Sequence, residues 1–210
     1  MMNDIEAYQS FTGLRHWYNK LWFSERMGYT CGPASIPPKE SGWYITRPII
    51  NLSGMGAGAK KVWIEKGDHR ATPLGHFWCQ FFEGRQYSVT YEWIGFWHPV
   101  SSWEGIKSDE DLSKFHRWER SDFLPTLSSA FDELSEVCAI NVEFIDNKPI
   151  EAHLRTSPDP DYDVLIPIWQ NEEYVVDTYR KMGYSYIDSF DDAEGFLDRP
   201  RIGFMVKNFK

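Results

Sequence analysis

The sequence predicts a mixed fold of helices and strands, which we assign to the α+β class with α/β as the alternative. Three observations support this assignment. Apolar residues recur at helical spacing in three segments: 11–27, 124–137 and 172–183. Segments rich in β-branched and aromatic residues indicate strands at 43–52, 60–68, 77–82, 86–93, 141–145, 149–155 and 201–209. The 210 residues suffice for one large domain or two small lobes.

The helices are predicted from apolar stripes and from residues that end helices. Over 11–27, Leu14, Tyr18 and Leu21 fall near one stripe, and Gly28 suits a helix end. The second helix repeats apolar residues at similar spacing: Leu124, Leu127, Phe131 and Leu134. Helices and strands alternate along the chain without an internal repeat, which is why a mixed fold is expected.

The composition disfavours several classes of function. A formal net charge of −9 argues against a broad nucleic-acid interface and against binding to anionic membranes, since both need a basic surface. The three cysteines are far apart, so neither a disulfide framework nor a cysteine-based zinc site is expected. The sequence has no apolar run of membrane-spanning length and no signal-peptide pattern at its start. We therefore expect a cytoplasmic protein.

The segment 141–155 is predicted to form two strands joined by a three-residue turn at 146–148. Counting outward from this turn places Glu143 opposite Glu151, and Asn141 opposite His153. Side chains alternate between the two faces of a strand. The polar face then carries Asn141, Glu143, Glu151, His153 and Arg155. The other face carries Ile140, Val142, Phe144, Ile150, Ala152 and Leu154.

Two glutamates directly opposite each other repel, so this hairpin needs positive charge between them. A divalent cation such as Mg²⁺, which takes one or two carboxylates together with phosphate oxygens, would meet that need. The alternative is a solvated sheet face on which Glu143 and Glu151 pair with basic side chains such as Arg155.

A glycine-rich stretch follows the strand predicted at 43–52 and contains Gly54, Gly56 and Gly58. Glycines let backbone N–H groups approach phosphate oxygens closely, and Arg47 on the preceding strand would add positive charge. The stretch lacks the Walker A pattern. A flexible hairpin is therefore as good an interpretation as a phosphate-binding loop.

Several short motifs follow one another in an order that is informative as a whole. Asn19-Lys20 begins a helical segment, and it is followed by MGYTCGPAS. Next come ITRPIINLSGMGAGA and QFFEGRQYSV, and the last motifs are VEF and IEAHLR. In this order the chain resembles the ATP-grasp family of ATP-dependent carboxylate ligases.

The resemblance implies two α/β lobes with antiparallel sheets that grip a nucleotide between them. Residues 1–90 would form the small lobe, with the glycine-rich loop and the hinge strand. Residues 91–210 would form the large lobe, with the metal-binding strand pair.

The resemblance also implies roles for individual residues. The nucleotide-binding residues would be Lys20, Arg47, Gly54, Gly56, Gly58, Gln80, Phe81, Phe82 and Gln86. Within this set the two cations contact phosphates, the glycines cover them, 80–82 contact adenine through the backbone, and Gln86 approaches the ribose. The metal ligands would be Glu143, Glu151 and His153, and the catalytic residues would be Arg47 and Arg155. The metal would be Mg²⁺, with Mn²⁺ as an alternative.

The sequence departs from the family pattern at four of these positions. Arg47 stands where the family usually has Lys, which keeps the charge but changes its geometry. Phe81 and Gln86 stand where glutamates are common, and His153 replaces a metal-binding Asn. These changes put adenine selectivity and the choice of metal in doubt.

The function implied is an ATP-dependent carboxylate–amine (or thiol) ligase that works through an acyl phosphate. A kinase that stops at phosphorylation is one alternative, and a non-catalytic module that binds nucleotide or a partner is another. Little sequence precedes Lys20, so the family's usual N-terminal α/β domain is not expected. Either a second copy or a partner protein would then replace it, or the chain is a minimal enzyme with a small or macromolecular acceptor. Such a compact form would suit a bacteriophage protein. The sequence does not identify the carboxylate or the acceptor.

Two further features each have two interpretations. Arg117 and Arg120 either hold a substrate group or belong to a solvated charged segment. The tryptophan-rich stretch 93–103 either lines a stacking pocket or belongs to the core.

Overall fold

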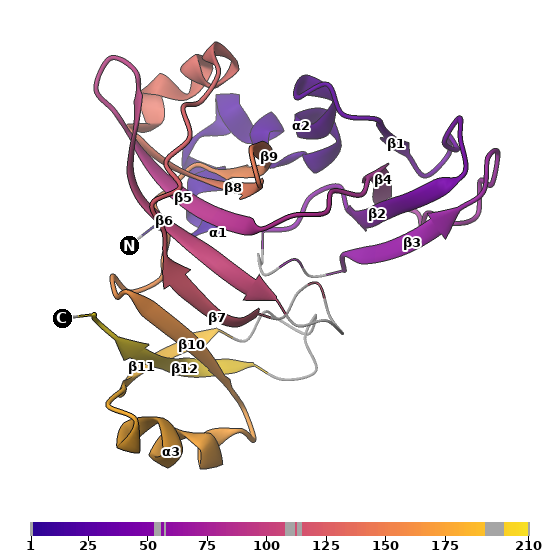
Figure 1. The fold of residues 1–210 in the computed structure, drawn as a ribbon. Coiled ribbons are helices and arrows are strands. Elements are labelled where there is room, and N and C mark those ends of the chain that lie inside the picture. Colours follow the sequence, from indigo (N-terminus) through magenta and orange to yellow (C-terminus); the bar gives the residue numbers. More distant parts are fainter. Residues whose placement is uncertain are drawn as a thin grey trace.

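The computed structural model describes residues 2–52, 56, 58–107, 112, 115–191 and 200–209. These residues form two sheets, and every strand pairing is antiparallel. The smaller sheet has the order β1-β4-β2-β3 and extends to one side of the molecule (Figure 1). Its strands are β1 (Cys31–Pro33), β2 (Gly42–Pro48), β3 (Lys60–Ile64) and β4 (His76–Gln80).

The larger sheet has the order β11-β12-β10-β7-β6-β5-β8-β9. Its strands are β5 (Gln86–Trp93), β6 (Trp97–Lys107), β7 (Phe115–Arg120), β8 (Ala139–Ile145), β9 (Lys148–His153), β10 (Val164–Trp169), β11 (Ser185–Asp191) and β12 (Arg201–Lys207). Two antiparallel sheets combined with separate helices confirm the α+β class, since α/β folds are built on parallel strands.

The helix predicted over 11–27 is in fact divided. The described segments are α1 (Asp4–Ser10), the 3₁₀ helix η1 (Thr12–Tyr18) and α2 (Lys20–Arg26). The division falls at Asn19, whose backbone is extended and whose side chain accepts a hydrogen bond from the Trp22 N–H. Such a cap begins a new helix, so the helix start expected at Asn19-Lys20 is confirmed while the continuous helix is wrong.

The helix predicted over 124–137 is shorter than expected. Only η2 (Ser129–Val137) is helical, with 3₁₀ geometry, and Ser128 before it is extended. Pro125 disfavours a helical conformation at Leu124, and its carbonyl accepts a hydrogen bond from Tyr91 Oη. The third helix is confirmed in its main part, as η3 (Glu173–Val175) followed by α3 (Val176–Lys181).

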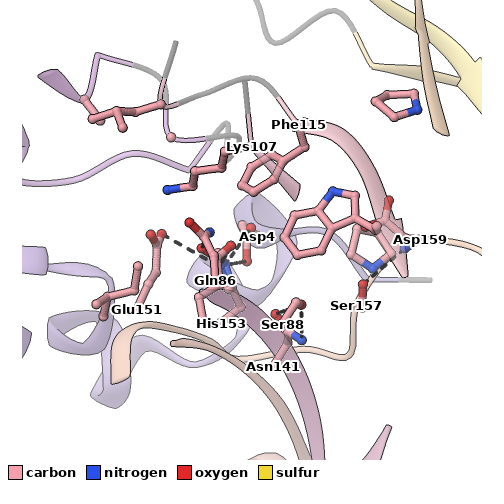
Figure 2. Close-up of a pocket in the computed structure, with 18 of the residues that line it drawn as sticks. Asp4, Gln86, Ser88, Lys107, Phe115, Asn141, Glu151, His153, Ser157 and Asp159 are labelled. Carbon is pink, nitrogen blue, oxygen red and sulfur yellow. Dashed lines mark hydrogen bonds and ion pairs between the residues drawn. The ribbon is translucent and has the colours of Figure 1, made fainter. Parts of the chain in front are cut away.

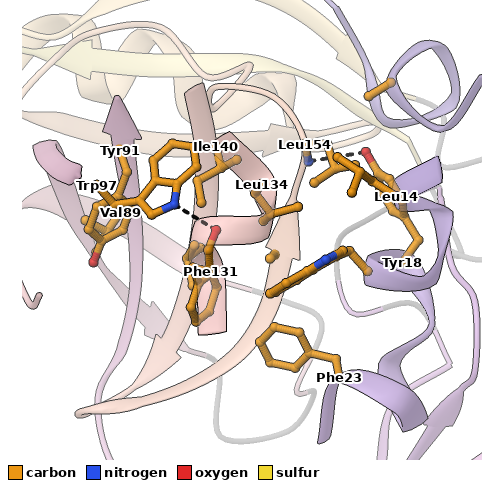
Figure 3. Packing of buried hydrophobic residues seen from close by; sticks show 14 of the residues in the cluster. Leu14, Tyr18, Phe23, Val89, Tyr91, Trp97, Phe131, Leu134, Ile140 and Leu154 are labelled. Atoms are coloured by element: carbon orange, nitrogen blue, oxygen red, sulfur yellow. Dashed lines mark hydrogen bonds between the residues drawn. The ribbon is translucent and has the colours of Figure 1, made fainter. Parts of the chain in front are cut away.

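The main core lies between the N-terminal helical segments, η2 and one face of the larger sheet (Figure 3). Trp17 and Phe23 from η1 and α2 pack with Phe131 and Leu134 of η2 and with strand residues such as Val89. The core interpretation of the tryptophan-rich stretch holds for Trp97, which is buried in the main core, and for Trp103, which is buried in a smaller cluster. The helical segments at 4–26 therefore pack on the larger sheet, and β5 belongs to that sheet. The lobe boundary at 90/91 stays a prediction.

The β8–β9 hairpin has the expected pairing at the end that lies away from its turn. Glu143 lies opposite Glu151, and Asn141 lies opposite His153. The expected apolar face is buried over Ile140, Val142, Phe144, Ala152 and Leu154.

The turn of this hairpin differs from the prediction. Ile145 pairs with Lys148, so the turn contains only Asp146 and Asn147. Asp146 has a φ of 47°, a conformation that Asp and Asn tolerate better than most residues. The predicted three-residue turn was wrong because Lys148, which was counted as its third residue, is the first residue of β9.

A β-bulge restores the expected register beyond the turn. Phe144 pairs with Pro149 and Glu143 pairs with Glu151, which leaves Ile150 as the extra residue on β9. Ile150 was expected on the buried apolar face, but it lines the pockets described below.

Among the described residues, no helix has the length and apolar character needed to cross a bilayer.

The buried position of Leu134 predicts a large effect of shortening its side chain. Leu134 is fully buried in the main core, so Leu134→Ala should lower the free energy of unfolding by about 2–5 kcal/mol. Leu74→Ala is the matched control, because Leu74 is 93% exposed and its loss should change stability by less than about 0.5 kcal/mol. Urea denaturation of both variants measures the difference, and equal effects would contradict this account of the core.

Candidate functional site

Two adjoining pockets lie between the two sheets. The first is polar and is lined by residues of α2, β2, β5, β8 and β9, among others (Figure 2). The second is more apolar and lies against the end of β4. Five residues line both pockets: Ile45, Arg47, Lys107, Leu112 and Ile150. The pockets are therefore two parts of one space that is bounded by both sheets.

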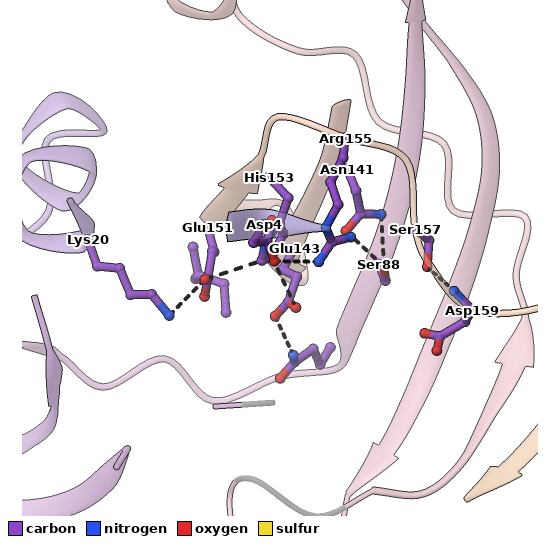
Figure 4. Close-up of polar contacts among 12 residues, drawn as sticks. Asp4, Lys20, Ser88, Asn141, Glu143, Glu151, His153, Arg155, Ser157 and Asp159 are labelled. Carbon is purple, nitrogen blue, oxygen red and sulfur yellow. Dashed lines mark hydrogen bonds and ion pairs between the residues drawn. The ribbon is translucent and has the colours of Figure 1, made fainter. Parts of the chain in front are cut away.

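Glu143 and Glu151 form the acidic centre of the first pocket, where each has cationic or polar neighbours (Figure 4). Lys20 Nζ lies 2.7 Å from Glu151 Oε1, and both side chains are nearly buried. Gln86 Nε2 donates to Glu143 Oε2 over 2.9 Å. The repulsion expected between the two carboxylates is thus offset by neighbouring side chains. Cross-strand pairing brings the two acids together, and α2 and β5 supply their partners.

His153 links the acidic pair to the N-terminal helix. Its Nε2 lies 3.7 Å from Glu143 Oε1 and 3.8 Å from Glu151 Oε1, while its Nδ1 lies 3.1 Å from both carboxylate oxygens of Asp4. Asp4 also pairs with Arg155 Nη2. This arrangement forms a buried chain of alternating charges from α1 to the pocket.

The charges in this chain reinforce one another. Burial acts to lower the pKa of His153, but the Asp4 carboxylate and the hydrogen bond to Glu143 raise that pKa to about 10. Burial acts to raise the pKa of Asp4, yet His153 and Arg155 hold it well below its usual range. Burial likewise acts to raise the pKa of Glu143, and the hydrogen bond and charge of His153 lower it. At neutral pH the carboxylates are therefore ionised and His153 is an imidazolium.

This geometry bears on the expected metal ligands. A metal-binding imidazole must be neutral, whereas His153 is charged and both of its nitrogens face carboxylates. Within the described ranges, no three His, Cys, Asp or Glu side chains are arranged to hold a metal ion by themselves. His153 thus positions the carboxylates, and Glu143 and Glu151 are the oxygen donors that a hard cation would use together with another ligand.

Arg155 pairs with protein groups at the edge of the first pocket. Its Nη2 pairs with Asp4 and its Nη1 donates to the Thr156 carbonyl oxygen. The side chain lines the first pocket, but its charge is directed at Asp4. We therefore treat Arg155 as a residue that holds Asp4 in place.

Three cationic side chains line the first pocket next to the acidic pair: Lys20, Arg47 and Lys107. Arg47 Nη2 donates to the Ile150 carbonyl oxygen over 2.9 Å, and Nη1 lies 3.9 Å from Glu151 Oε2. In the part of the chain that the structure describes, the buried Nε of Arg47 has no hydrogen-bond partner. Such an unsatisfied donor at a pocket wall is what an anionic ligand would satisfy.

Lys107 was not identified from the sequence. It ends β6 and lines both pockets, and its ammonium group lies 5.6 Å from the centre of the Phe115 ring. Burial lowers the pKa of Lys107, while Glu143 acts to raise it. The signal was missed because the segment 94–120 gave no clear strand pattern, so the face on which Lys107 lies could not be assigned.

The second pocket contains the expected hinge segment. Phe81 and Phe82 line it, and Phe82 packs edge-on against Tyr29 with ring centres 4.8 Å apart. Gln80 also lines this pocket, and its side-chain oxygen accepts a hydrogen bond from the Thr30 N–H. An apolar slot lined by aromatic side chains suits a flat heterocycle.

The other sequence candidates are distributed as follows. Gly56 lines the first pocket, and Gly58 has a φ of +77° and packs close to Pro48. Gly54 lies outside the described residues. Arg117 and Arg120 do not line either pocket, and they pair with acidic residues instead. The interpretation of a charged, partly exposed segment is therefore the better one for these two arginines.

Comparison with solved structures identifies the fold. The chain is similar to carboxyaminoimidazole ribonucleotide synthase from Aspergillus clavatus complexed with ATP, at 10% identity and a TM-score of 0.56, over 98% of this chain and 73% of that chain. It is also similar to N5-carboxyaminoimidazole synthetase from Staphylococcus aureus complexed with ADP, at 11% identity and a TM-score of 0.56, over 94% and 69%. These likenesses show the fold alone, and it is the ATP-grasp fold.

A third solved structure matches over a smaller region. The L-amino acid ligase from Bacillus licheniformis is 15% identical with a TM-score of 0.45, and the chain spans 42% of that protein's length. No protein-family model matches the chain, and a search of curated proteins finds no match.

The buried charges around Asp4 predict a strong dependence of stability on this residue. Asp4→Asn removes the carboxylate that pairs with Arg155 and with Nδ1 of His153, and it leaves the buried Arg155 without its charged partner, which should cost about 3–5 kcal/mol. Asp177→Asn is the control, since its side chain is 80% exposed and its pair with Arg180 should be worth less than about 0.5 kcal/mol. Denaturant unfolding measures both, and a neutral Asp4→Asn would show that the buried chain of charges does not support the fold.

Proposed function

We propose that the protein binds ATP with Mg²⁺ between its two sheets and uses it to join a carboxylate to an amine or thiol. The observation that supports this most directly is the grouping of Glu143 and Glu151 with Lys20, Arg47 and Lys107 in one pocket. Two carboxylates beside lysine and arginine side chains match the needs of a metal–triphosphate group, which carries negative charge and a bound cation.

The two pockets suit the two ends of the nucleotide. The adenine ring would enter the second pocket, against Phe81 and Phe82, with Gln86 near the ribose. The triphosphate would extend into the first pocket, which Arg47 lines and where its Nη1 lies 3.9 Å from Glu151 Oε2. Gly56 lines the same pocket and would let backbone approach the phosphates.

The acidic pair fits Mg²⁺ in its chemistry. Glu143 and Glu151 are both carboxylates on facing strand positions, and Mg²⁺ favours one or two carboxylates with phosphate oxygens as its other ligands. When bound, the ion would neutralise phosphate charge and orient the terminal phosphate. In the structure the Lys20 ammonium group lies against the Glu151 carboxylate. It would balance the negative charge of that carboxylate until Mg²⁺ binds, and it would then pair with a phosphate oxygen.

The reaction would proceed in two steps. A carboxylate oxygen of the substrate attacks the γ-phosphorus of ATP, the bond to the bridging oxygen breaks, and ADP leaves with both electrons of that bond. An amine or thiol then attacks the acyl carbon, loses its proton, and inorganic phosphate leaves. Arg47 and Lys107 would hold the transferred phosphoryl group in place, and their charges would stabilise the charge that it develops.

The two synthetases of similar fold were solved with ATP and with ADP, which supports nucleotide binding by this chain. At 10% and 11% identity they do not identify its substrates. A substrate panel therefore decides between the ligase and the two alternatives named above, the kinase and the non-catalytic module.

The first test of the proposal is nucleotide-dependent stabilisation. Mg-ATP at 100 times its Kd should stabilise the wild type by about 2.7 kcal/mol, or roughly 5–10 °C in Tm. The double variant Glu143→Gln/Glu151→Gln should lose the Mg²⁺-dependent part of this shift, because it lacks the anionic ligands. Thermal unfolding with ATP, with and without Mg²⁺, measures the effect.

The matched control for this test is Glu92→Gln/Glu136→Gln, which makes the same charge change at two exposed positions. It should keep the full shift. A wild type that no nucleotide stabilises would overturn the proposal, and ATP binding without turnover on a broad carboxylate and amine panel would favour the non-catalytic module.

A second test concerns Lys107. Lys107→Met should weaken ATP binding by about 10–100-fold, the value of one charge-assisted hydrogen bond, and should change adenosine binding little. Isothermal titration calorimetry with both ligands measures the two effects, and Lys181→Met, at an exposed position of α3, is the control. Equal weakening of ATP and adenosine would mean that Lys107 shapes the pocket without contacting phosphate.

A further inference from the structure

One face of the larger sheet changes from polar to aromatic along the first pocket. Gln86 of β5 pairs with Gly105 of β6, Gly105 pairs with Trp118 of β7, and Trp118 pairs with Leu165 of β10. Directly paired residues lie on the same face of a sheet. The face that carries Gln86 beside the carboxylates therefore continues without interruption to Trp118, and the first pocket spans both parts.

The aromatic part depends on a missing side chain. Phe115 and Trp118 pack with ring centres 4.3 Å apart and an interplanar angle of 32°. A Cβ atom at Gly105 would come within 2.6 Å of the Phe115 ring and 2.7 Å of the Trp118 ring. Glycine at this position of β6 thus leaves the room that the two packed rings occupy.

Strand β10 extends this surface with residues on the same face. Pro167 and Trp169 follow Leu165 at intervals of two, so they share its face, and both line the first pocket. We call Phe115, Trp118, Pro167 and Trp169 the aromatic wall. It offers an apolar, largely aromatic lining that the nucleotide site does not need, because the second pocket already provides an apolar slot for adenine.

Charged groups bound the aromatic wall at both ends. Lys107 Nζ lies 5.6 Å from the Phe115 ring centre at the phosphate end. At the other end Trp169 pairs with Arg201, whose Nη1 lies 3.7 Å from Asp159 Oδ1. Figure 2 shows Glu151 on one side of the pocket and Asp159 on the other, with Phe115 above the space between them. The apolar section is therefore short and begins beside the phosphate-binding cations.

We infer that the aromatic wall binds the carboxylate substrate, and that this substrate is an aryl carboxylate with a flat ring of one or two cycles. Its ring would stack on Phe115 and Trp118, and its carboxylate would point toward Lys107, where the γ-phosphate of ATP would lie. Flat surfaces of this kind favour aromatic rings over saturated ones of equal size. The inference rests on the proposed function and adds the class of substrate to it.

The experiment uses benzoate and indole-3-carboxylate as flat probes, with cyclohexanecarboxylate and acetate as non-aromatic controls. Calorimetric titration of the full chain in Mg²⁺ and a non-hydrolysable ATP analogue measures binding, and each titration is repeated without nucleotide. ADP release with hydroxylamine as a simple amine acceptor measures turnover. The flat probes should bind about tenfold more tightly than cyclohexanecarboxylate and should raise ADP release.

Two variants test the aromatic wall itself. Trp118→Leu removes one ring, and Gly105→Ala pushes both rings out of position. Each should weaken binding of the flat probes about tenfold and bring it to the level of cyclohexanecarboxylate. Trp63→Leu is the control, since Trp63 is 49% exposed on β3 of the smaller sheet. Circular dichroism of each variant establishes that it is folded, and either of the two wall variants is sufficient for the test.

The outcomes separate this inference from the proposed function. Stabilisation by Mg-ATP with no preference for flat carboxylates would overturn the substrate class and leave ATP binding intact. Unchanged binding of benzoate in folded Trp118→Leu would also overturn it. Absence of nucleotide binding would remove the proposed function, and the titrations without nucleotide would then decide whether the wall binds aryl carboxylates at all.

Discussion

The facing carboxylates of Glu143 and Glu151 require positive charge around them, and the arrangement of the molecule's centre follows from that requirement. Each surrounding element contributes a partner: α2 contributes Lys20, β2 contributes Arg47, and β9 contributes His153. Because buried charges are costly unless they are paired, these elements must come together in one arrangement. The charge and hydrogen bond of His153 also lower the pKa of Glu143, which favours the carboxylate form that can bind a cation.

The sequence predicted the pattern of the hairpin better than its details. Alternation of side chains identified the buried face and the acidic pair, because the period of a strand is simple and both faces were chemically distinct. The bulge at Ile150 could not be read from this pattern, since one extra residue in β9 compensates for one residue fewer in the turn. The helix at 11–27 failed for a similar reason: its apolar stripe continues through Asn19, and only the extended backbone there reveals the division.

The candidate site was predicted where motifs were local and missed where it depends on the tertiary structure. Lys20, Arg47, Gln86 and the two glutamates lie in the first pocket as expected from their order in the chain. Asp4 carried no sequence signal, because its partners are brought to it only by folding. Lys107 and the aromatic wall belong to β6, β7 and β10, whose pairing with β5 could not be derived from a segment without clear periodicity. Side-chain chemistry was thus easier to predict than the set of neighbours that gives it a role.

The contact between Asp4 and His153 also has a consequence for how the chain acquires its structure. The two residues are 149 positions apart, so the charge that holds His153 is supplied by a part of the chain that is synthesised well before His153. During synthesis α1 has no access to this contact until β9 has emerged, and long-range contacts of this kind slow folding. The contact between Asp4 and His153 must therefore form late, after the larger sheet has brought both ends of the charge chain together.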